Sequence, residues 1–379
     1  MDLGLTEIQL MLKSSAKEFL SQECPLTFVR EMEEHPSGYT EELWQQLSSL
    51  GWTGLAFPEI YGGTGGTFTD LAVLLEEMGR SLLPGPFFST VILGGLTILD
   101  VGSDTQKMYF LPKICDGSTK IAFALTEATA TCEPWGIETI AEPESGNHRL
   151  NGTKLFVQDA STADWLLVAA KTDLNALPEQ GITLFLVPAK QDNIKINPLK
   201  TIALDSQCEI VFDNVQVSSD SIVGSLNTGW PIIENTLQRA IAGQCIEMLG
   251  GADAVLEMTV EYAKQRTQFG RPVGSFQAVQ HHCANMATDV EGSRQIAYQA
   301  AWRVSEGLPS LREVAMAKAW VSGAYQRVCS TAHQCHGAIG FTKEHDLQLY
   351  TRRAKVQELR YGDISSHKEM VLQQIEFQG

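Results

Sequence analysis

The apolar periodicity of this chain changes twice, and no other feature limits its possible folds as strongly. Up to about residue 118, apolar residues recur at helical spacing, as the leucines and Met78 do in "DLAVLLEEMG". From about residue 119 to 225, short β-branched or aromatic runs alternate with polar turns, which is typical of strands. From about residue 226 onward long helical patterns return, with "VQHHCANMATDVEGSRQIAYQAAWRV" as a clear example.

This order of helices, strands and helices predicts an α+β chain with segregated layers and disfavours a doubly wound parallel sheet. We expect a helical domain at 1–118, a β domain at 119–225 and a second helical domain at 226–379. A chain of 379 residues is long enough for about two to three ordinary domains. The predicted strands lie in five runs: "KIAFALTE", "RLNGTKLFVQ", "DWLLVAAK", "GITLFLVPA" and "CEIVFDNVQVS".

Charge and cysteine content exclude several classes of protein. A formal charge of −17 argues against binding nucleic acid, which needs clustered Lys and Arg, although it also serves solubility. The eight cysteines form no C-x-x-C pair, so we expect buried thiols in a reducing compartment and no metal site. The start "MDLGLTEIQL" is acidic where a signal peptide is basic, and "PFFSTVILGGLTIL" is shorter than the ~20 residues of a membrane span. A cytoplasmic protein without membrane insertion is expected.

Six segments, in order along the chain, resemble the acyl-CoA dehydrogenase family: "PEIYGGTGG", "FALTEA", "LNGTKLFV", "IVFDNVQV", "RTQFGRPVGSFQAVQ" and "QCHGAIGFT". The resemblance extends essentially from end to end, and the order of the segments makes it specific. It implies an N-terminal helical domain, a middle β domain and a C-terminal four-helix bundle, usually assembled as tetramers. It also implies FAD, held between the β domain and the C-terminal bundles of two subunits.

The resemblance assigns cofactor contacts in the C-terminal domain to two stretches. Arg266 would clamp the FAD pyrophosphate of a neighbouring subunit and Phe269 would lie near the adenosine, with Gln277 as a further polar contact. A planar guanidinium makes bidentate phosphate contacts, although a cation that ends a helix is the alternative for Arg266. The second stretch, which would run past the pyrophosphate, contributes Gln334, Gly337 and Gly340.

In the middle domain, the resemblance assigns flavin contacts to Phe123, Leu125, Thr126, Thr131, Cys132, Phe156, Val157 and Gln158. Thr126 and nearby backbone groups would bond the flavin edge, and Phe156 would shield one face of the ring or be a core strand residue, or both. Thr131 and Cys132 replace the Gly and Ser that relatives use for FAD phosphate and CoA, so close backbone approach is restricted there.

The chemistry that the resemblance implies is α,β-dehydrogenation of an acyl-CoA thioester. A carboxylate removes the α-proton while the β-hydrogen leaves as hydride to flavin N5. In many relatives this Glu precedes the Gly where the present chain has Tyr361, in "YTRRAKVQELRYGD". A tyrosine, with a pKa near ~10, is a poor base. Other relatives carry the Glu at the position of Ala240–Ile241, which has no acid here.

Two acids remain as candidates for the base, Glu247 and Asp363. Glu247 lies in "AIAGQCIEMLGGADAVL", where glycines three and four residues away would let another helix, or a flavin and thioester, come close. A structural Glu paired with an Arg or a helix N-terminus is the alternative. Asp363 stands two residues past the usual base and would need a backbone shift. Glu247 is the preferred base.

Three functions follow from the resemblance. The first is an FAD-dependent acyl-CoA dehydrogenase that passes electrons to an electron-transfer flavoprotein. "LLPGPF" and "RRAKVQELRYGD" look most like the bacterial subgroup acting on cyclic, branched or steroid-derived acyl-CoAs. The second is a non-catalytic or FAD-sharing subunit, so the assembly would be a homotetramer or an α2β2 heterotetramer. The third is an enoyl-CoA reductase that runs the reaction in reverse.

Overall fold

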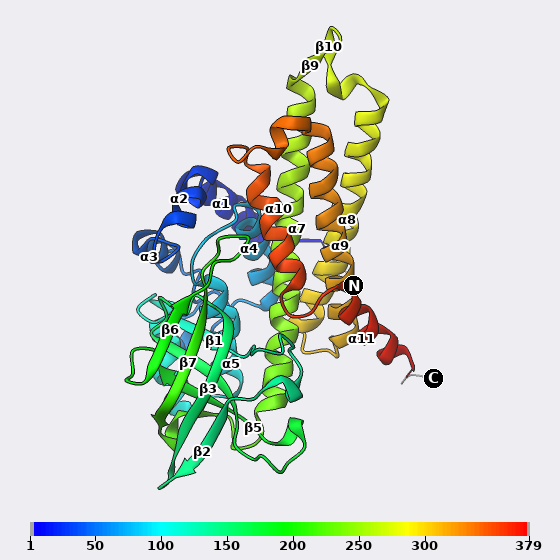
Figure 1. Cartoon of the computed structure of the whole chain (residues 1–379). Coiled ribbons are helices and arrows are strands. Elements are labelled where there is room, and N and C mark those ends of the chain that lie inside the picture. The colour runs from blue at the N-terminus through cyan, green and yellow to red at the C-terminus, as the bar shows by residue number, and fades with distance from the viewer. Residues whose placement is uncertain (1–3, 377–379) are drawn as a thin grey trace. The chain divides into compact units, whose positions relative to one another are not determined.

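The computed structural model describes residues 4–376 (Figure 1). The α-helices are α1 (Glu7–Glu23), α2 (Leu26–Glu34), α3 (Glu41–Ser49), α4 (Phe68–Arg80), α5 (Leu96–Val101), α6 (Asp104–Cys115), α7 (Gly229–Gln265), α8 (Gln277–Ser305), α9 (Leu311–His336), α10 (Leu347–Leu359) and α11 (Ile364–Glu376). The strands are β1 (Ile121–Ala124), β2 (Ile140–Glu144), β3 (Asn147–Gln158), β4 (Trp165–Lys171), β5 (Ile182–Pro188), β6 (Ile194–Pro198), β7 (Gln207–Val217), β8 (Ile222–Val223), β9 (Thr267–Gln268) and β10 (Arg271–Pro272).

This succession of helices, strands and helices confirms the predicted fold class. Contacts between residues divide the chain into two compact units. The helical unit comprises the chain up to Glu31, Phe68–Leu83 and the chain from Ile241 on, and the sheet unit comprises Met32–Thr67 and Pro84–Ala240. The range 1–118 therefore contributes to both units, and the three domain boundaries stay a prediction.

The sheet unit is built on a mixed sheet with the strand order β6-β7-β3-β2-β4-β5-β8, in which β1 pairs with β4 in parallel. The five predicted runs became β1, β3, β4, β5 and β7, which confirms them. β2, β6 and β8 were missed, because "IAEPE" and "IKINP" mix proline or charge into short runs and β8 has two residues. The core lies where alternate residues such as Leu150, Val168 and Phe185 point inward and are fully buried.

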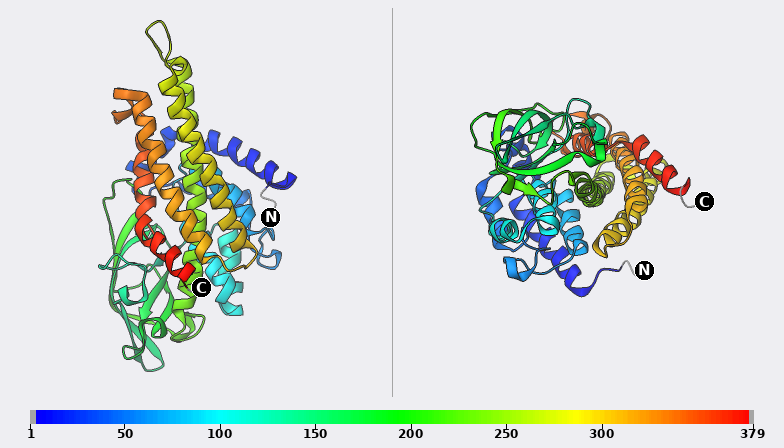
Figure 2. Two further views of the ribbon diagram at one scale, coloured as in Figure 1. Left: turned by 90° about the vertical axis from the view of Figure 1, so that its right-hand side faces the viewer. Right: turned by 90° about the horizontal axis from the view of Figure 1, so that it is seen from below.

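The helical unit is built around the long helices α7, α8, α9 and α10, which run side by side in Figures 1 and 2. The amphipathic pattern predicted within 279–304 is realised as α8. In α4 the predicted apolar face, Leu71, Leu74, Leu75 and Met78, is buried as expected. Along α1 the burial is concentrated at Ala16 and Leu20, while Ile8 at its start is exposed.

Helices α4 and α7 cross with their backbones almost in contact. A Cβ at Gly250 would lie 2.8 Å from the backbone nitrogen of Arg80, and a Cβ at Gly79 would lie 2.5 Å from the Cα of Glu247. Such distances are shorter than any Cβ tolerates, so the crossing needs glycine on both helices. Two of the glycines near Glu247 are therefore explained by packing: Gly250 faces α4, and Gly251 faces the ring of Tyr325.

A buried charge cluster also ties α4 to its neighbours. Glu76 is 2% exposed and accepts hydrogen bonds from Lys13 Nζ at 2.7 Å, from the Tyr298 hydroxyl at 2.6 Å and from Arg294. Burial by itself would raise the pKa of Glu76, but the Arg294 and Lys13 cations outweigh it and hold that pKa below its usual value. The acid therefore stays ionised and anchors α1 and α8 to α4.

The most apolar stretch of the chain forms a buried π-helical segment, Phe88–Gly95, that leads into α5. All eight residues of this segment are buried. None of the helices between residues 4 and 376 is long and apolar enough to cross a lipid bilayer.

Candidate active site

The predicted site residues fall into two groups, one in each compact unit, and each group is described by itself. In the sheet unit, the first group begins at the end of β1. Phe123 and Leu125 are buried, and Thr126, two residues past the strand, is half-buried. The backbone of Thr126 accepts a hydrogen bond from the Leu155 nitrogen at 2.8 Å, which joins this segment to β3.

Strand β3 contains an irregularity at the aromatic residue that was predicted to cover the flavin. The register against β7 shifts between Lys154 and Val157, and Phe156 within it has a φ of 55°. Positive φ is a genuine outlier for a bulky residue, and a bulge re-aims the side chain it carries. Phe156 is 51% exposed whereas Val157 is buried and Gln158 half-buried, so the reading of Phe156 as a core residue is wrong.

The turn after β1 carries Thr131 and Cys132, both half-buried. The Ala130 nitrogen donates to the Glu127 carbonyl at 2.9 Å, and the Thr131 hydroxyl accepts from the Glu133 nitrogen at 3.2 Å. Thr131 thus bonds within its own turn, as threonine commonly does. Its methyl group fills the space where a Cβ at Gly136 would otherwise stand.

Two charged residues in this group were missed as site residues, although both lie in quoted motifs. Lys154 is completely buried, and its Nζ lies 2.6 Å from Glu127 Oε1 and 3.1 Å from the Leu125 carbonyl oxygen. Burial lowers the pKa of Lys154, and the Glu127 carboxylate opposes that shift. A Lys and a Glu inside otherwise apolar strand runs were the available signal, because such charges are rarely buried unless paired.

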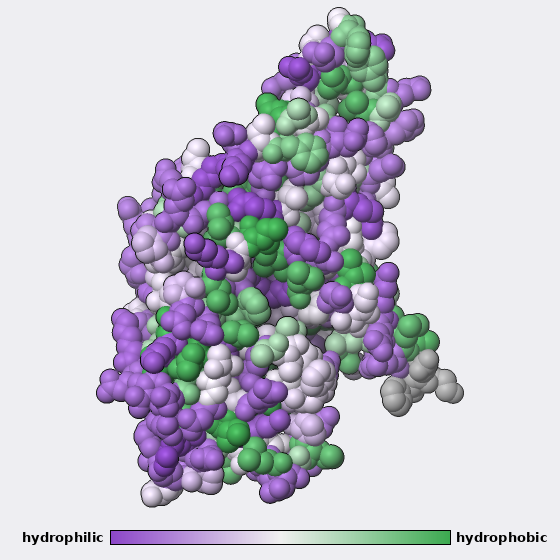
Figure 3. Space-filling model, in the orientation of Figure 1, coloured by the Kyte–Doolittle hydropathy of each residue, from purple (hydrophilic) through white to green (hydrophobic). Residues whose placement is uncertain are grey.

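In the helical unit, the second group gathers at one end of the long helices. Arg266 follows α7, Gln277 opens α8, and the β9–β10 hairpin between them extends beyond both helices (Figure 1). All of these residues are exposed, and Phe269 at the hairpin tip is 92% exposed. In the face drawn in Figure 3, hydrophilic residues dominate and a small apolar group lies at this tip.

The end of α9 lies at the same end of the unit. The Tyr262 ring of α7 stacks on the His336 ring at 4.4 Å, and its hydroxyl donates to the His336 carbonyl at 3.3 Å. Gln334 is exposed, and beside Gly337, with φ +64°, a Cβ would meet no atom within 4 Å. Gly340 is buried under the turn. The structure therefore brings the Arg266 and Gln334–Gly340 stretches together.

In the helical unit, the exposed Arg266 guanidinium and the open backbone at Gly337 suit a phosphate group. In the sheet unit, the turned-out Phe156 ring suits the face of an isoalloxazine. Each group by itself fits the part of FAD assigned to it. Within residues 4–376, no three His, Cys, Asp or Glu side chains gather as a metal site would require.

Glu247, the preferred base, lies in the middle of α7 and is half-buried. The Gln357 amide of α10 donates to its Oε2 at 3.3 Å. Gln357 belongs to a buried polar cluster in which Lys318 of α9 donates to the Gln357 carbonyl and, at 2.7 Å, to Gln244 Oε1. A carboxylate thus stands at the edge of a polar cluster inside the helical unit.

Asp363 caps helix α11. Its Oδ1 accepts from the Ser366 nitrogen and hydroxyl, both at 2.8 Å. These two hydrogen bonds hold the pKa of Asp363 below its usual value. At the usual position of the base, Tyr361 has a φ of 60° and its carbonyl lies 2.9 Å from His367 Nε2. The turn to which the resemblance assigns the base is here a helix cap.

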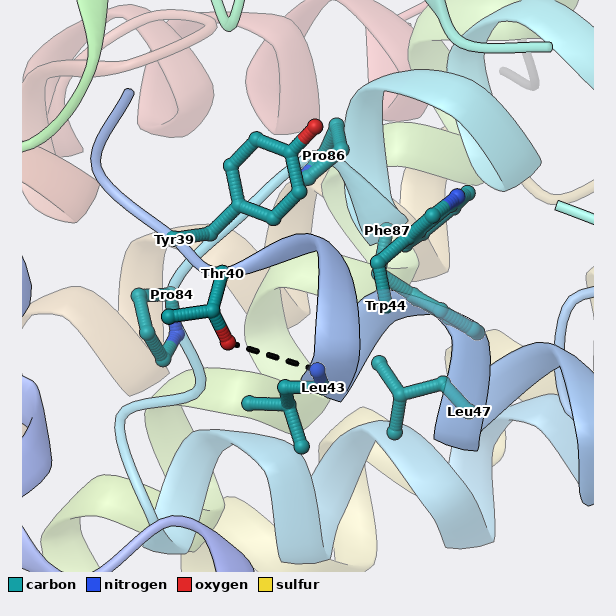
Figure 4. Close-up of a pocket in the computed structure, with 8 residues that line it drawn as sticks. All are labelled: Tyr39, Thr40, Leu43, Trp44, Leu47, Pro84, Pro86 and Phe87. Atoms are coloured by element: carbon teal, nitrogen blue, oxygen red, sulfur yellow. Dashed lines mark hydrogen bonds between the residues drawn. The ribbon is translucent and has the colours of Figure 1, made fainter. Parts of the chain in front are cut away.

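A small cleft in the sheet unit, between α3 and the segment before the π-helix, is too small for a cofactor. Figure 4 shows its lining: Tyr39, Thr40, Leu43, Trp44, Leu47, Pro84, Pro86 and Phe87. The empty space among them is about 200 Å³, below the ~300 Å³ at which ligand pockets begin. The Thr40 hydroxyl caps α3 there by accepting from the Leu43 nitrogen at 3.3 Å.

Comparison with known proteins gives matches along nearly the whole chain. Three family profiles match in succession: acyl-CoA dehydrogenase N-terminal domain at residues 6–118, middle domain at 122–215 and C-terminal domain at 227–376. The short-chain specific acyl-CoA dehydrogenase of Megasphaera elsdenii is 32% identical over 377 residues, which is 96% of each chain. Subunit CarC of the caffeyl-CoA reductase–Etf complex of Acetobacterium woodii is 29% identical over 367 residues, again 96% of each.

Comparison with solved structures agrees with these sequence matches. Butyryl-CoA dehydrogenase from Megasphaera elsdenii matches with a TM-score of 0.92 and 30% identity, and the match covers 99% of this chain and 100% of the other.

Proposed function

Because the chain belongs to the acyl-CoA dehydrogenase family, we propose that it catalyses α,β-dehydrogenation of an acyl-CoA thioester. The family, its oxidoreductase class and its dependence on FAD, all expected from the motifs, are confirmed by the matches. The reaction, its base and its partners are proposals. The gathering of Arg266, Gln334 and Gly337 at one end of the helical unit supports the flavin site on which the proposed reaction depends.

When bound, FAD supplies the acceptor for the hydride that leaves the β-carbon. Arg266 would pair with its phosphates, and the backbone at Gly337 offers the close approach that a pyrophosphate needs. In the sheet unit, the Thr126 hydroxyl would hold the flavin edge and Phe156 would cover one face of the ring. Among the remaining predicted contacts, Phe269 and Gln277 are exposed and free to reach a neighbouring subunit.

We assign the α-proton to the Glu247 carboxylate. Asp363 is the poorer base because its carboxylate already caps α11 and its pKa is depressed. Glu247 is half-buried, and its carboxylate accepts a hydrogen bond from the Gln357 amide, which orients it. A base must reach the α-hydrogen at roughly 2.6–3.2 Å, so substrate has to approach this face of α7.

Anaerobic bleaching of the flavin by candidate acyl-CoAs tests this assignment. Glu247→Gln is expected to bleach at least about 100-fold more slowly, the usual contribution of a positioned base. The matched control is Asp363→Asn, which removes a carboxylate but keeps the helix cap, and it should bleach at the wild-type rate. Normal bleaching in Glu247→Gln with slow bleaching in Asp363→Asn would transfer the role to Asp363.

The relative CarC gives a reason to keep the reverse reaction as a second candidate, since its name describes a reductase complex with Etf. Oxidation of the reduced flavin by an enoyl-CoA, faster than its reduction by the acyl-CoA, would favour the reductase. The lack of an acid at Tyr361 supports a third candidate, the non-catalytic subunit of a heterotetramer. Colourless protein that gains flavin only with a co-expressed partner would establish it.

The proposed partners are an acyl-CoA with a cyclic, branched or steroid-derived acyl group and an electron-transfer flavoprotein. The Etf complex of CarC supports the second of these. A homotetramer or α2β2 assembly in the cytoplasm is proposed with them. Sedimentation of the purified protein, with and without a co-expressed paralogue, distinguishes the two assemblies.

A further inference from the structure

A lysine and a glutamate are buried together inside the sheet unit. Lys154 is 0% exposed and Glu127 is 3% exposed, and the ammonium and carboxylate are 2.6 Å apart. Moving each ion out of water costs several kcal/mol, and their mutual attraction offsets this only when further hydrogen bonds are well made. Replacing such a pair by apolar residues is often neutral, so stability alone does not explain a lysine at this place.

The further hydrogen bonds of the pair go to backbone groups of two chain segments outside β3, the strand that carries Lys154. Lys154 Nζ donates to the Leu125 carbonyl at 3.1 Å, just past β1. The Glu127 carboxylate accepts from the backbone nitrogens of Glu138 at 2.8 Å and Thr139 at 3.0 Å. The pair therefore fixes the exit of β1, the strand β3 and the return of the chain from the intervening turn.

Three candidate flavin contacts of the sheet unit, Leu125, Thr126 and Phe156, lie next to this pair in sequence or at the bulge that begins at Lys154. Leu125 and Thr126 directly precede Glu127, and the bulge that turns Phe156 outward begins at Lys154. Between them, the Leu155 nitrogen bonds to the Thr126 carbonyl at 2.8 Å. A change in the pair would thus move both the strand end and the aromatic ring.

We propose that Lys154 and Glu127 are positioning residues for the flavin, which hold the Leu125–Thr126 backbone and the Phe156 bulge in the geometry that binds the isoalloxazine. This inference rests on the proposed flavin site. The positioning depends on the Lys154 ammonium because it donates a hydrogen bond to the Leu125 carbonyl. An apolar side chain could fill the same volume, but it could not hold that carbonyl in place.

The test compares two double variants by FAD affinity of the apoprotein, the visible spectrum of bound flavin and the unfolding temperature without FAD. Lys154→Met with Glu127→Gln removes both charges and keeps an oxygen acceptor for the two backbone nitrogens. We expect FAD affinity at least about tenfold weaker and a shifted flavin spectrum, measured well below the unfolding temperature. The control, Arg149→Met with Glu144→Gln, removes a surface pair of β2 and β3 and should leave both readouts unchanged.

Wild-type FAD affinity and spectrum in the Lys154/Glu127 double variant would overturn the inference, whatever its unfolding temperature, because a purely structural pair would lower only the latter. If that variant does not fold, Glu127→Gln alone is measured in the same way, and wild-type affinity and spectrum there overturn the inference equally. Failure of the wild-type protein itself to bind FAD would instead refute the proposed flavin site.

Discussion

Substitution of Gly250 by alanine tests the close crossing of α4 and α7 directly. The new Cβ would stand 2.8 Å from the Arg80 nitrogen and 2.9 Å from the Glu76 carbonyl carbon, and closer still to the Glu76 oxygen. These are backbone atoms of α4, so no side-chain rotation relieves the clash. Overpacking costs up to about 3 kcal/mol, and alanine returns about 1 kcal/mol of helix propensity, so we expect a net loss of about 2 kcal/mol.

The matched control is Gly323→Ala in α9. There a Cβ would meet the flexible end of Arg327 at 3.1 Å and Ile364 Cδ1 at an ordinary contact distance of 3.8 Å, so the propensity gain should dominate and raise stability by up to about 1 kcal/mol. Urea unfolding followed by far-UV circular dichroism measures both variants against wild type. An unfolding midpoint of Gly250→Ala at or above wild type would refute the backbone-contact reasoning, and with it the packing account of the glycines beside Glu247.

Three further results are expected. Burial lowers the pKa of His367 to about 4, against ~6.5 in the unfolded chain. This histidine therefore contributes stability above pH ~6.5 that is lost as the pH falls toward 4. In His367→Gln the unfolding midpoint should fall less steeply over that pH range. Asp363→Ala should lower stability by about 0.5–2 kcal/mol in denaturant titrations while Asp363→Asn does not, because only the latter keeps the cap. Arg266→Ala should weaken FAD binding at least about tenfold by fluorescence titration, whereas the exposed neighbour Lys264→Ala should not, and equal affinities would contradict the phosphate role.

Sequence patterns predicted helices and strands correctly where the pattern depends only on residues close together in the chain. Side chains on one face of a helix recur every three to four residues, so the apolar face of α4 and the extent of α8 could be read directly. Short apolar runs bounded by polar turns likewise identified β4 and β5. The short strand β6 could not be found in this way, because pairing with β7 and not its own composition makes it a strand.

The candidate base shows the limit of such patterns. Glycines near Glu247 on the helix indicate that something large comes close, but not whether it is a helix or a ligand. The tertiary structure decides for Gly250, since α4 occupies that side. In the same way, Asp363 looks like a free acid in the sequence, and only the fold shows it capping α11.

The sequence by itself determined the order of helical and sheet segments and the family, and it gave the proposed FAD contacts, because each depends on residue type and spacing along the chain. Only the tertiary structure decided that Lys154 and Glu127 form a buried pair and that Phe156 turns outward at a bulge. The reason is physical: burial, charge pairing and bulge geometry depend on which distant segments pack together, and no local pattern encodes that.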